Sequence, residues 1–220
     1  MRKHLSRLAF FLFAITIAGT ASAATITQSG GGGALPDLST VTFDIVIGSS
    51  GTVSDVTVRF DITHPQVGDL RVSITNVAGG ITQDLVYRLG GDTFNRNYGG
   101  EYVFNDGFTT GTYSGNIWTA ANAVVGGTNG VVPVGNYFAS TTTGTPVALS
   151  AAFGGTEAAG TWRLTIQDYR SSNTGTLNGW GLTIETDDST PPPTPTVPEP
   201  STYILFGIGL GALASLRRRR

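Results

Sequence analysis

Residues 160–168, GTWRLTIQD, carry the pattern that decides the fold. Trp162, Leu164 and Ile166 alternate with polar residues, so one face of the segment is apolar and the other is polar. A period of two is the side-chain period of a β-strand, and strands with one apolar face are typical of antiparallel sheets. The segment therefore predicts a strand that places one face in a hydrophobic core.

The same alternation recurs in other parts of the chain. It is found in residues 41–47, 56–63, 70–75 and 180–185. No segment between Thr25 and Glu185 shows a sustained stripe with the 3.6-residue period of a helix. We therefore predict an all-β fold, an antiparallel β-sandwich of the jelly-roll type. Residues 90–146 are rich in Gly, Thr and Asn, and we expect short strands within them because a structureless run of that length is unusual.

Composition narrows the classes of function. The 220 residues include 31 Gly and no Cys, which excludes disulfides and thiolate metal ligands. Of the 13 basic residues, seven lie in residues 1–23 and 198–220, which leaves six against 14 of the 15 acidic residues in the part between. So acidic a body is a poor candidate for binding nucleic acid and a reasonable one for binding divalent cations.

The N-terminus has the three parts of a secretory signal peptide. A basic start, an apolar run over residues 8–19 and the small residues Ala21-Ser22-Ala23 occur in that order. We therefore predict a signal peptide at residues 1–23 and an exported chain. Residues 24–39 are interpreted as a flexible Gly-rich leader, and residues 40–187 as the folded domain.

The C-terminus resembles a bacterial PEP-CTERM sorting signal. A Pro-rich linker at residues 188–197 precedes the sequence VPEPS at 197–201, an apolar run at 203–216 and Arg217–Arg220. At about 1.5 Å per residue, 14 residues reach only ~21 Å of a ~30 Å hydrocarbon core, so this is a short transmembrane run. The resemblance implies that an exosortase-type membrane enzyme recognises and cleaves residues 198–220. It also implies delivery to the cell surface, the outer membrane or the extracellular matrix of a bacterium.

Two stretches resemble the P domain (P/Homo B domain) of proprotein convertases and subtilisin-like proteases. They are residues 61–72, with the pattern His-x3-Gly-Asp-Leu, and residues 153–182, with Gly-Thr-Trp-x-Leu-x-Ile-x-Asp. The resemblance extends over residues 41–186 and implies a jelly-roll β-sandwich. In that family the domain follows a subtilisin-like catalytic domain, stabilises it and often binds calcium.

No catalytic residues are predicted. A serine-protease triad needs a His base, and residues 24–220 contain only His64, which we interpret as a packing or hydrogen-bonding residue. No Gly-x-Ser-x-Gly motif is present. Pairs of carboxylates for sugar hydrolysis remain open, but nothing in the sequence selects one pair.

A calcium site is the best candidate for chemistry. Its predicted ligands are Asp69, Asp106, Asp168 and Asn173, each at a strand end or in a polar turn. Calcium takes six to eight oxygen ligands of these types. Asp69 and Asp168 also match positions at which the P-domain family keeps Asp. The alternative is that these residues are solvated turn residues that bond their own backbone.

Aromatic residues crowd the central segment. They are Phe94, Tyr98, Tyr102, Phe104, Phe108, Tyr113 and Trp118. They either stack on sugars of an exopolysaccharide or form a second hydrophobic layer beneath long loops. Trp162 and Trp180 lie on the apolar faces of predicted strands and are expected in the core.

The sequence therefore predicts an exported surface or matrix protein with a non-catalytic binding or structural domain. The alternative is an accessory of a separately encoded subtilisin-like protease. A hydrolase with an unrecognised site is a third interpretation, which no particular residue supports.

Overall fold

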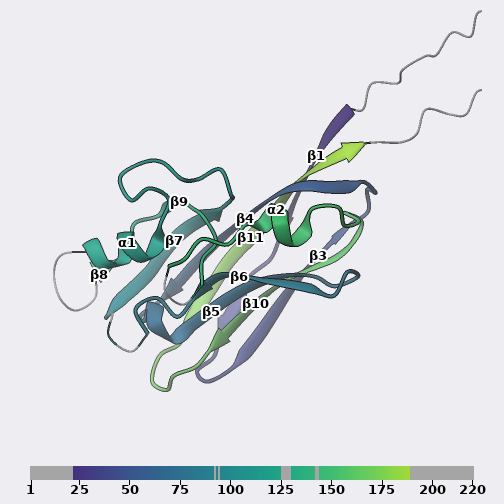
Figure 1. Ribbon diagram of the computed structural model, residues 1–220. Helices are drawn as coiled ribbons and strands as arrows, with labels where there is room; N and C mark the ends of the chain where they lie inside the picture. Colours follow the sequence, from purple (N-terminus) through teal and green to yellow (C-terminus); the bar gives the residue numbers. More distant parts are fainter. Residues whose placement is uncertain (1–21, 92, 94, 125–129, 142–143, 189–220) are drawn as a thin grey trace, which may run out of the picture. The chain divides into compact units, whose positions relative to one another are not determined.

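The computed structural model describes residues 22–188 except 92, 94, 125–129 and 142–143, and these form two packed β-sheets (Figure 1). The larger sheet contains β1 (Ser22–Gly30), β2 (Gly33–Leu35), β4 (Thr52–His64), β7 (Arg96–Phe104), β8 (Gly130–Val131), β9 (Gly135–Tyr137) and β11 (Gly175–Asp188). The smaller sheet contains β3 (Thr40–Ile47), β5 (Leu70–Asn76), β6 (Ile81–Tyr87) and β10 (Gly160–Asp168). Successive strands repeatedly cross between the sheets, which confirms the predicted all-β sandwich of jelly-roll type.

The alternating residues of each predicted strand face the space between the sheets. In β10, the side chains of Trp162, Leu164 and Ile166 are at most 1% exposed, whereas the residues between them are half-buried. β10 pairs antiparallel with β3 on one side and with β5 on the other. Trp180 in β11 is also buried, so both tryptophans lie in the core as predicted.

The Gly-rich leader is a strand of the sandwich, which corrects the prediction for residues 24–39. β1 pairs antiparallel with β11 over nine residues, from Ser22 opposite Asp188 to Gly30 opposite Trp180. β2 also pairs antiparallel with β11, nearer to the start of that strand. The domain therefore begins at residue 22 rather than 40. Cleavage of the predicted signal peptide after Ala23 would leave β1 to start at Ala24.

Residues 90–146 contain strands β7, β8 and β9. The composition of this segment predicted short strands without giving their positions. β7 pairs antiparallel with β4, whereas β8 and β9 pair parallel with β7, an exception to the predicted antiparallel sheets. Two short helices accompany them, α1 (Ile117–Ala123) and α2 (Leu149–Phe153). Asn116 begins α1 by accepting hydrogen bonds from two amides of its first turn.

The first and last residues of the domain lie at one tip, and the loops near Gly175 lie at the other. Ser22 and Asp188 are paired, so the chain enters and leaves at the same tip, where β1 begins and β11 ends (Figure 1). β11 has 14 residues and starts at Gly175, at the opposite end. With a rise of about 3.3 Å per residue, the two ends of β11 lie about 43 Å apart. Loops near Gly175 are therefore held far from Ser22 and Asp188.

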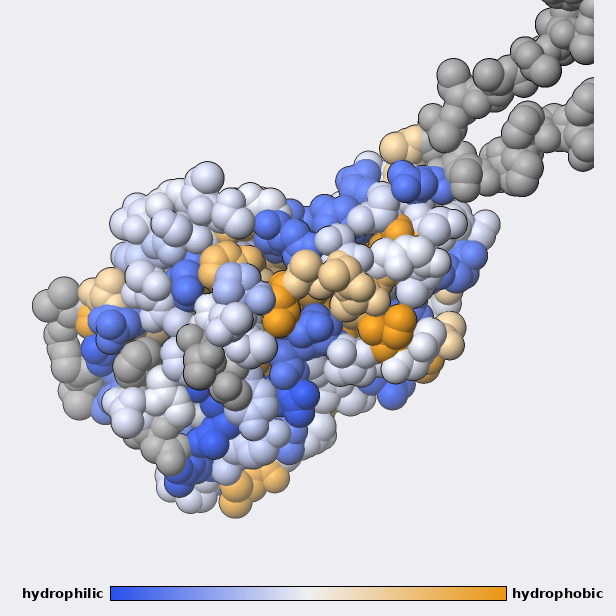
Figure 2. Space-filling view, viewed as in Figure 1, coloured by the Kyte–Doolittle hydropathy of each residue, from blue (hydrophilic) through white to orange (hydrophobic). Residues whose placement is uncertain are grey.

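Hydrophobic surface is divided into small areas. On the face shown in Figure 2, hydrophobic side chains form separate patches among polar ones. The exposed large hydrophobic residues of the described chain are Leu38, Val46, Val77, Val131 and Val134. They come from different strands and loops, as is usual for a folded protein surface.

Candidate functional site

Four polar side chains gather at the end of the sandwich opposite Ser22 and Asp188. His64 ends β4, Asp69 lies in the 3₁₀ turn η1 (Val67–Asp69), Asp168 ends β10, and Asn173 lies in the loop before β11. Asp168 is the register partner of Leu70, so pairing of β5 with β10 brings Asp168 next to Asp69, although 99 positions separate them in sequence. We call His64, Asp69, Asp168 and Asn173 the distal cluster.

His64 joins the two sheets at this cluster. Its ring is fully buried. Nδ1 donates to the Gln66 carbonyl oxygen at 2.9 Å when it carries the proton, and accepts from the Gln66 backbone N–H at 3.2 Å when the proton is on Nε2. Nε2 lies 3.3 Å from Asp168 Oδ2, close enough for an ion pair, but the direction of approach is not that of a hydrogen bond. The His64 ring is therefore a packing and hydrogen-bonding group, as the sequence predicted.

The two carboxylates of the cluster accept hydrogen bonds from different donors. Asp69 Oδ2 accepts a hydrogen bond from the Asn173 amide at 2.9 Å. Asp168 Oδ1 accepts one from the Arg170 backbone N–H, also at 2.9 Å. Asp168 Oδ2 is buried and, among the described residues, has no hydrogen-bond partner. A buried carboxylate oxygen without a hydrogen bond is costly, and among the described residues only His64 Nε2, at 3.3 Å, forms an ion-pair contact with this atom, so a cation would be stabilised here.

Burial raises the pKa of the Asp69 carboxyl above its usual value, and the nearby Asp168 charge adds to the rise. The Asn173 hydrogen bond and the electrostatic interactions with His64 and Arg170 lower the pKa of Asp69 without cancelling the rise. Because the folded state holds the Asp69 proton more tightly than the unfolded state, stability falls as the pH rises from the ordinary carboxyl pKa of the unfolded chain to the raised pKa of the folded protein.

We predict a pH dependence from this sign. In buffer containing EDTA, Asp69→Asn should match the wild type at a pH below the ordinary carboxyl pKa and become relatively more stable as the pH rises through the folded pKa of Asp69. The measurement is the difference in free energy of unfolding between the two proteins, by denaturant titration across acidic to neutral pH. A difference that shrinks with rising pH would contradict it.

Asp106, the fourth predicted calcium ligand, is engaged at the start of α2. Its carboxylate accepts hydrogen bonds from the backbone N–H groups of Leu149 and Ser150 at 2.7 and 2.9 Å, and from the Ser150 hydroxyl at 2.6 Å. First-turn amides of a helix have no partner within the helix, and a carboxylate there satisfies them. The structure thus brings together Asp69, Asp168 and Asn173 and gives Asp106 a separate role.

The oxygen atoms of the distal cluster fit calcium in type but provide only part of a coordination sphere. Two carboxylates and one side-chain amide supply hard oxygen ligands, and water or backbone carbonyls would have to complete the six to eight that calcium takes. Within the described ranges, no group of three or more His, Asp or Glu side chains is arranged to hold a metal ion. Calcium binding therefore stays a prediction.

The central aromatic residues divide into two groups. Tyr98, Tyr102 and Phe104 are buried on β7, as a second hydrophobic layer requires, and burial raises the pKa of Tyr102 to about 12. Phe108 and Tyr113 instead lie in the loop after β7, where they line a pocket together with Tyr137. Trp118 packs half-buried against the core, and Phe94 lies outside the described residues. The sequence did not single out Tyr137; its only signal was a short apolar pair, Tyr137-Phe138.

Two segments of the chain match known families. Residues 135–184 match the proprotein convertase P-domain. This P-domain match runs from β9 into β11 and includes Asp168 and Asn173 of the distal cluster. Residues 196–220 match the PEP-CTERM protein-sorting motif, which indicates export, exosortase-type processing and sorting to the bacterial cell surface.

The chain is also similar to two solved structures of a serine protease from Aeromonas sobria. The protease in complex with the chaperone is 15% identical, with a TM-score of 0.47, over 76% of this chain and 28% of that one. The second protease structure is 16% identical, with a TM-score of 0.45, over 75% of this chain and 27% of that one. The chain thus spans just over a quarter of these proteins. None of the curated proteins matches it.

No helix within the described ranges is long and apolar enough to cross a membrane. The predicted signal peptide up to residue 21, the Pro-rich linker from 189 and the apolar run at 203–216 lie outside the described residues.

Proposed function

We propose that this protein is an exported, surface-sorted display protein whose P-domain-like sandwich is a non-catalytic binding or structural module stabilised by calcium. The sorting motif and the P-domain match support the first part. The placement of the domain's first and last residues supports display, because Ser22 and Asp188 are paired at one tip of the domain and the distal cluster lies at the other.

The observation that carries the calcium proposal is the buried oxygen of Asp168. Asp168 Oδ2 has no hydrogen-bond partner among the described residues, and it lies beside the second carboxylate of the distal cluster. Two carboxylates close together repel, and a cation bound by both would remove the repulsion and satisfy the buried oxygen. His64, with Nε2 3.3 Å from Asp168 Oδ2, and nearby Arg170 offset part of this charge, so the gain from a cation is moderate.

With only two charged ligands, the affinity for calcium should be low. Extracellular calcium modules have dissociation constants of about 10⁻⁴–10⁻³ M, and affinity falls with the number of charged ligands. A site of this strength is filled outside the cell wherever calcium is millimolar. It would stabilise the loops of the distal end after export.

We predict a saturable rise of the melting temperature when calcium is added to the purified exported protein. At 10–100 times the dissociation constant, the native state gains about 1.4–2.7 kcal/mol. For a domain of this size that is about 3–10 °C. Thermal melts in EDTA and across a calcium titration measure it, with magnesium as a control for ionic strength.

The calcium response of substituted proteins distinguishes a bound calcium ion from a general effect of salt on stability. Asp69→Asn and Asp168→Asn should lose the calcium response, and Asp69→Asn should do so without loss of stability in EDTA. Asp187→Asn, which removes an exposed carboxylate at the opposite end, is the matched control and should keep the response. A flat titration of the wild type, or an equal response in all variants, would reject the calcium site.

The P-domain match favours one further candidate, an accessory of a separately encoded subtilisin-like protease. Such an accessory should co-purify with a secreted protease and change its activity or its half-life. A display module should instead stay with washed cells, and its deletion should leave secreted protease activity unchanged. Peptidase activity in the purified chain itself would contradict the non-catalytic proposal.

A further inference from the structure

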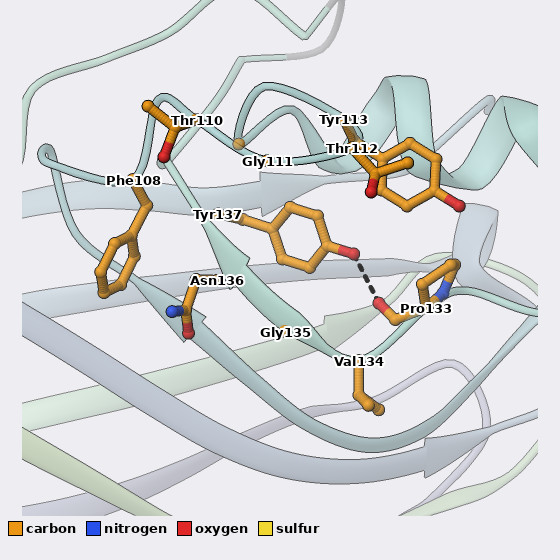
Figure 3. A pocket seen from close by; sticks show the side chains of 11 residues that line it. Phe108, Thr110, Gly111, Thr112, Tyr113, Pro133, Val134, Gly135, Asn136 and Tyr137 are labelled. Carbon is orange, nitrogen blue, oxygen red and sulfur yellow. Dashed lines mark hydrogen bonds between the residues drawn. The ribbon is translucent and has the colours of Figure 1, made fainter.

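A pocket of about 380 Å³ opens between the loop after β7 and the loop that leads into β9 (Figure 3). Its volume lies within the range of about 300–1,000 Å³ that small-molecule sites occupy. Residues 108–115 form one side and residues 133–137 the other. Three aromatic rings line it, from Phe108, Tyr113 and Tyr137. Three polar side chains accompany them, from Thr110, Thr112 and Asn136.

The pocket lining carries no charge. None of its 11 residues is acidic or basic, although the protein as a whole is acidic. Tyr137 could acquire a charge only by losing its proton, but burial raises the pKa of its phenol well above the usual value. The protonated hydroxyl donates a hydrogen bond to the Pro133 carbonyl, as Figure 3 shows. An ionic ligand would have no countercharge here, so its desolvation would not be offset.

Backbone contacts hold the two sides of the pocket in place. The Asn105 amide donates to the Tyr137 carbonyl at 3.0 Å, and the Phe138 amide donates to the Gly115 carbonyl at 2.9 Å. Gly115 has a φ of 69°, and a Cβ there would lie 1.5 Å from the Phe108 carbonyl oxygen, so only glycine allows this close approach. The pocket is therefore formed before any ligand arrives, which reduces the entropic cost of binding.

Four side chains of the lining are exposed, those of Val134, Asn136, Thr110 and Thr112. Val134 is 55% exposed, and its apolar surface borders the pocket. Asn136 is exposed on β9 and offers both a donor and an acceptor. The half-buried rings of Phe108 and Tyr113, one exposed apolar side chain and neutral hydrogen-bonding groups thus border the pocket, whereas Tyr137 is only 3% exposed and forms part of its wall.

We propose that this pocket binds a sugar unit of a neutral glycan. A pyranose ring has apolar C–H faces that pack on aromatic and aliphatic side chains, and its hydroxyls exchange hydrogen bonds with neutral amides and hydroxyls. The lining provides both kinds of contact and lacks the charge that an acidic sugar or a charged peptide side chain would need. This inference deepens the proposed binding role and rests on it, but it does not depend on calcium.

The test is a titration of the purified exported protein with neutral oligosaccharides of glucose and of N-acetylglucosamine, followed by NMR and calorimetry. Oligogalacturonate, which is anionic, is the comparison ligand. We expect saturable binding of at least one neutral oligosaccharide, with the largest amide shifts at Gly111, Gly115 and Gly135. We expect no comparable shifts with oligogalacturonate.

Three variants locate the binding. Tyr113→Ala should weaken it about tenfold or more, the change expected when about 1.4 kcal/mol of contact energy is lost. Tyr113 packs partly against the core, so Asn136→Ala, whose side chain is exposed, provides a second test that leaves the fold intact. Asn95→Ala changes an exposed Asn near the other end of β7 and should bind as the wild type does.

Four results would overturn the inference. They are the absence of binding by every neutral oligosaccharide, preferential binding of oligogalacturonate, equal affinity in Asn136→Ala and wild type, and shifts that fall outside the pocket. The failure of this proposal is distinguishable from that of the calcium site, because the glycan titration can fail while the calcium melt succeeds, and the reverse.

Discussion

Replacing Trp162 with Ala should lower the free energy of unfolding by about 3–5 kcal/mol, the usual cost of deleting a large buried aromatic ring. The Trp162 side chain is fully buried in β10, with strands on both sides, and its ring lies 5.1 Å from that of Phe153 in α2. The deletion leaves a cavity between the sheet and α2. For a domain of this size the melting temperature should fall by about 6–20 °C.

A second variant separates the cavity from the lost hydrogen bond. Trp162 Nε1 donates to the Ala158 carbonyl at 2.9 Å inside the core. Trp162→Phe keeps an aromatic ring but leaves that carbonyl without its donor, which should cost about 1–3 kcal/mol. Thermal and denaturant unfolding measure both variants. If Trp162→Ala were no less stable than Trp162→Phe, the placement of this ring between β10 and α2 would be wrong.

Replacing Gly68 with Ala should have the second largest effect, because it forces two backbone segments apart. A Cβ on Gly68 would lie 1.8 Å from the Gly91 carbonyl oxygen and 3.3 Å from that of Leu89. Neither contact involves a flexible side chain, so the cost should reach or exceed the upper end of the range of about 1–3 kcal/mol for overpacking. The Gly68 carbonyl also accepts a hydrogen bond from Arg88 Nε at 2.9 Å, which the shift would strain.

The change at Gly68 should also affect the distal cluster, because Asp69 is the next residue. We expect Gly68→Ala to lower the melting temperature by about 6–12 °C and to reduce any calcium response. Gly48→Ala is the matched control, since no atom lies within 4 Å of the added methyl group. Equal melting temperatures of the two variants would show that η1 does not approach residues 89–91 as closely as the structure has it.

These predictions rest on features that the sequence reveals to different degrees. Alternation of apolar residues predicted β3, β4, β5, β10 and β11, because a strong period of two survives wherever one face is buried. β1 escaped detection because Ile26 is its one large apolar residue, so no alternation stands out. The pairing of β1 with β11 over nine residues, rather than a hydrophobic pattern, places it in the sheet.

The distal cluster was likewise only partly predictable from the sequence. Sequence patterns selected Asp69, Asp168 and Asn173 one at a time, and nothing in the chain order separates them from Asp106. Only the antiparallel register of β5 and β10 brings Asp168 beside Asp69. Asp106 has the same carboxylate, but its position opposite the start of α2 gives it the role of a helix cap.

The sequence alone determined the β-sandwich, the core positions of Trp162 and Trp180, and the C-terminal sorting motif, because each depends on local pattern or composition. The tertiary structure decided which aromatic residues are core and which line a pocket. It also decided which acidic residues lie close together and that Ser22 and Asp188 lie at one tip of the domain. These depend on strand register and on contacts between residues far apart in sequence, which no local pattern encodes.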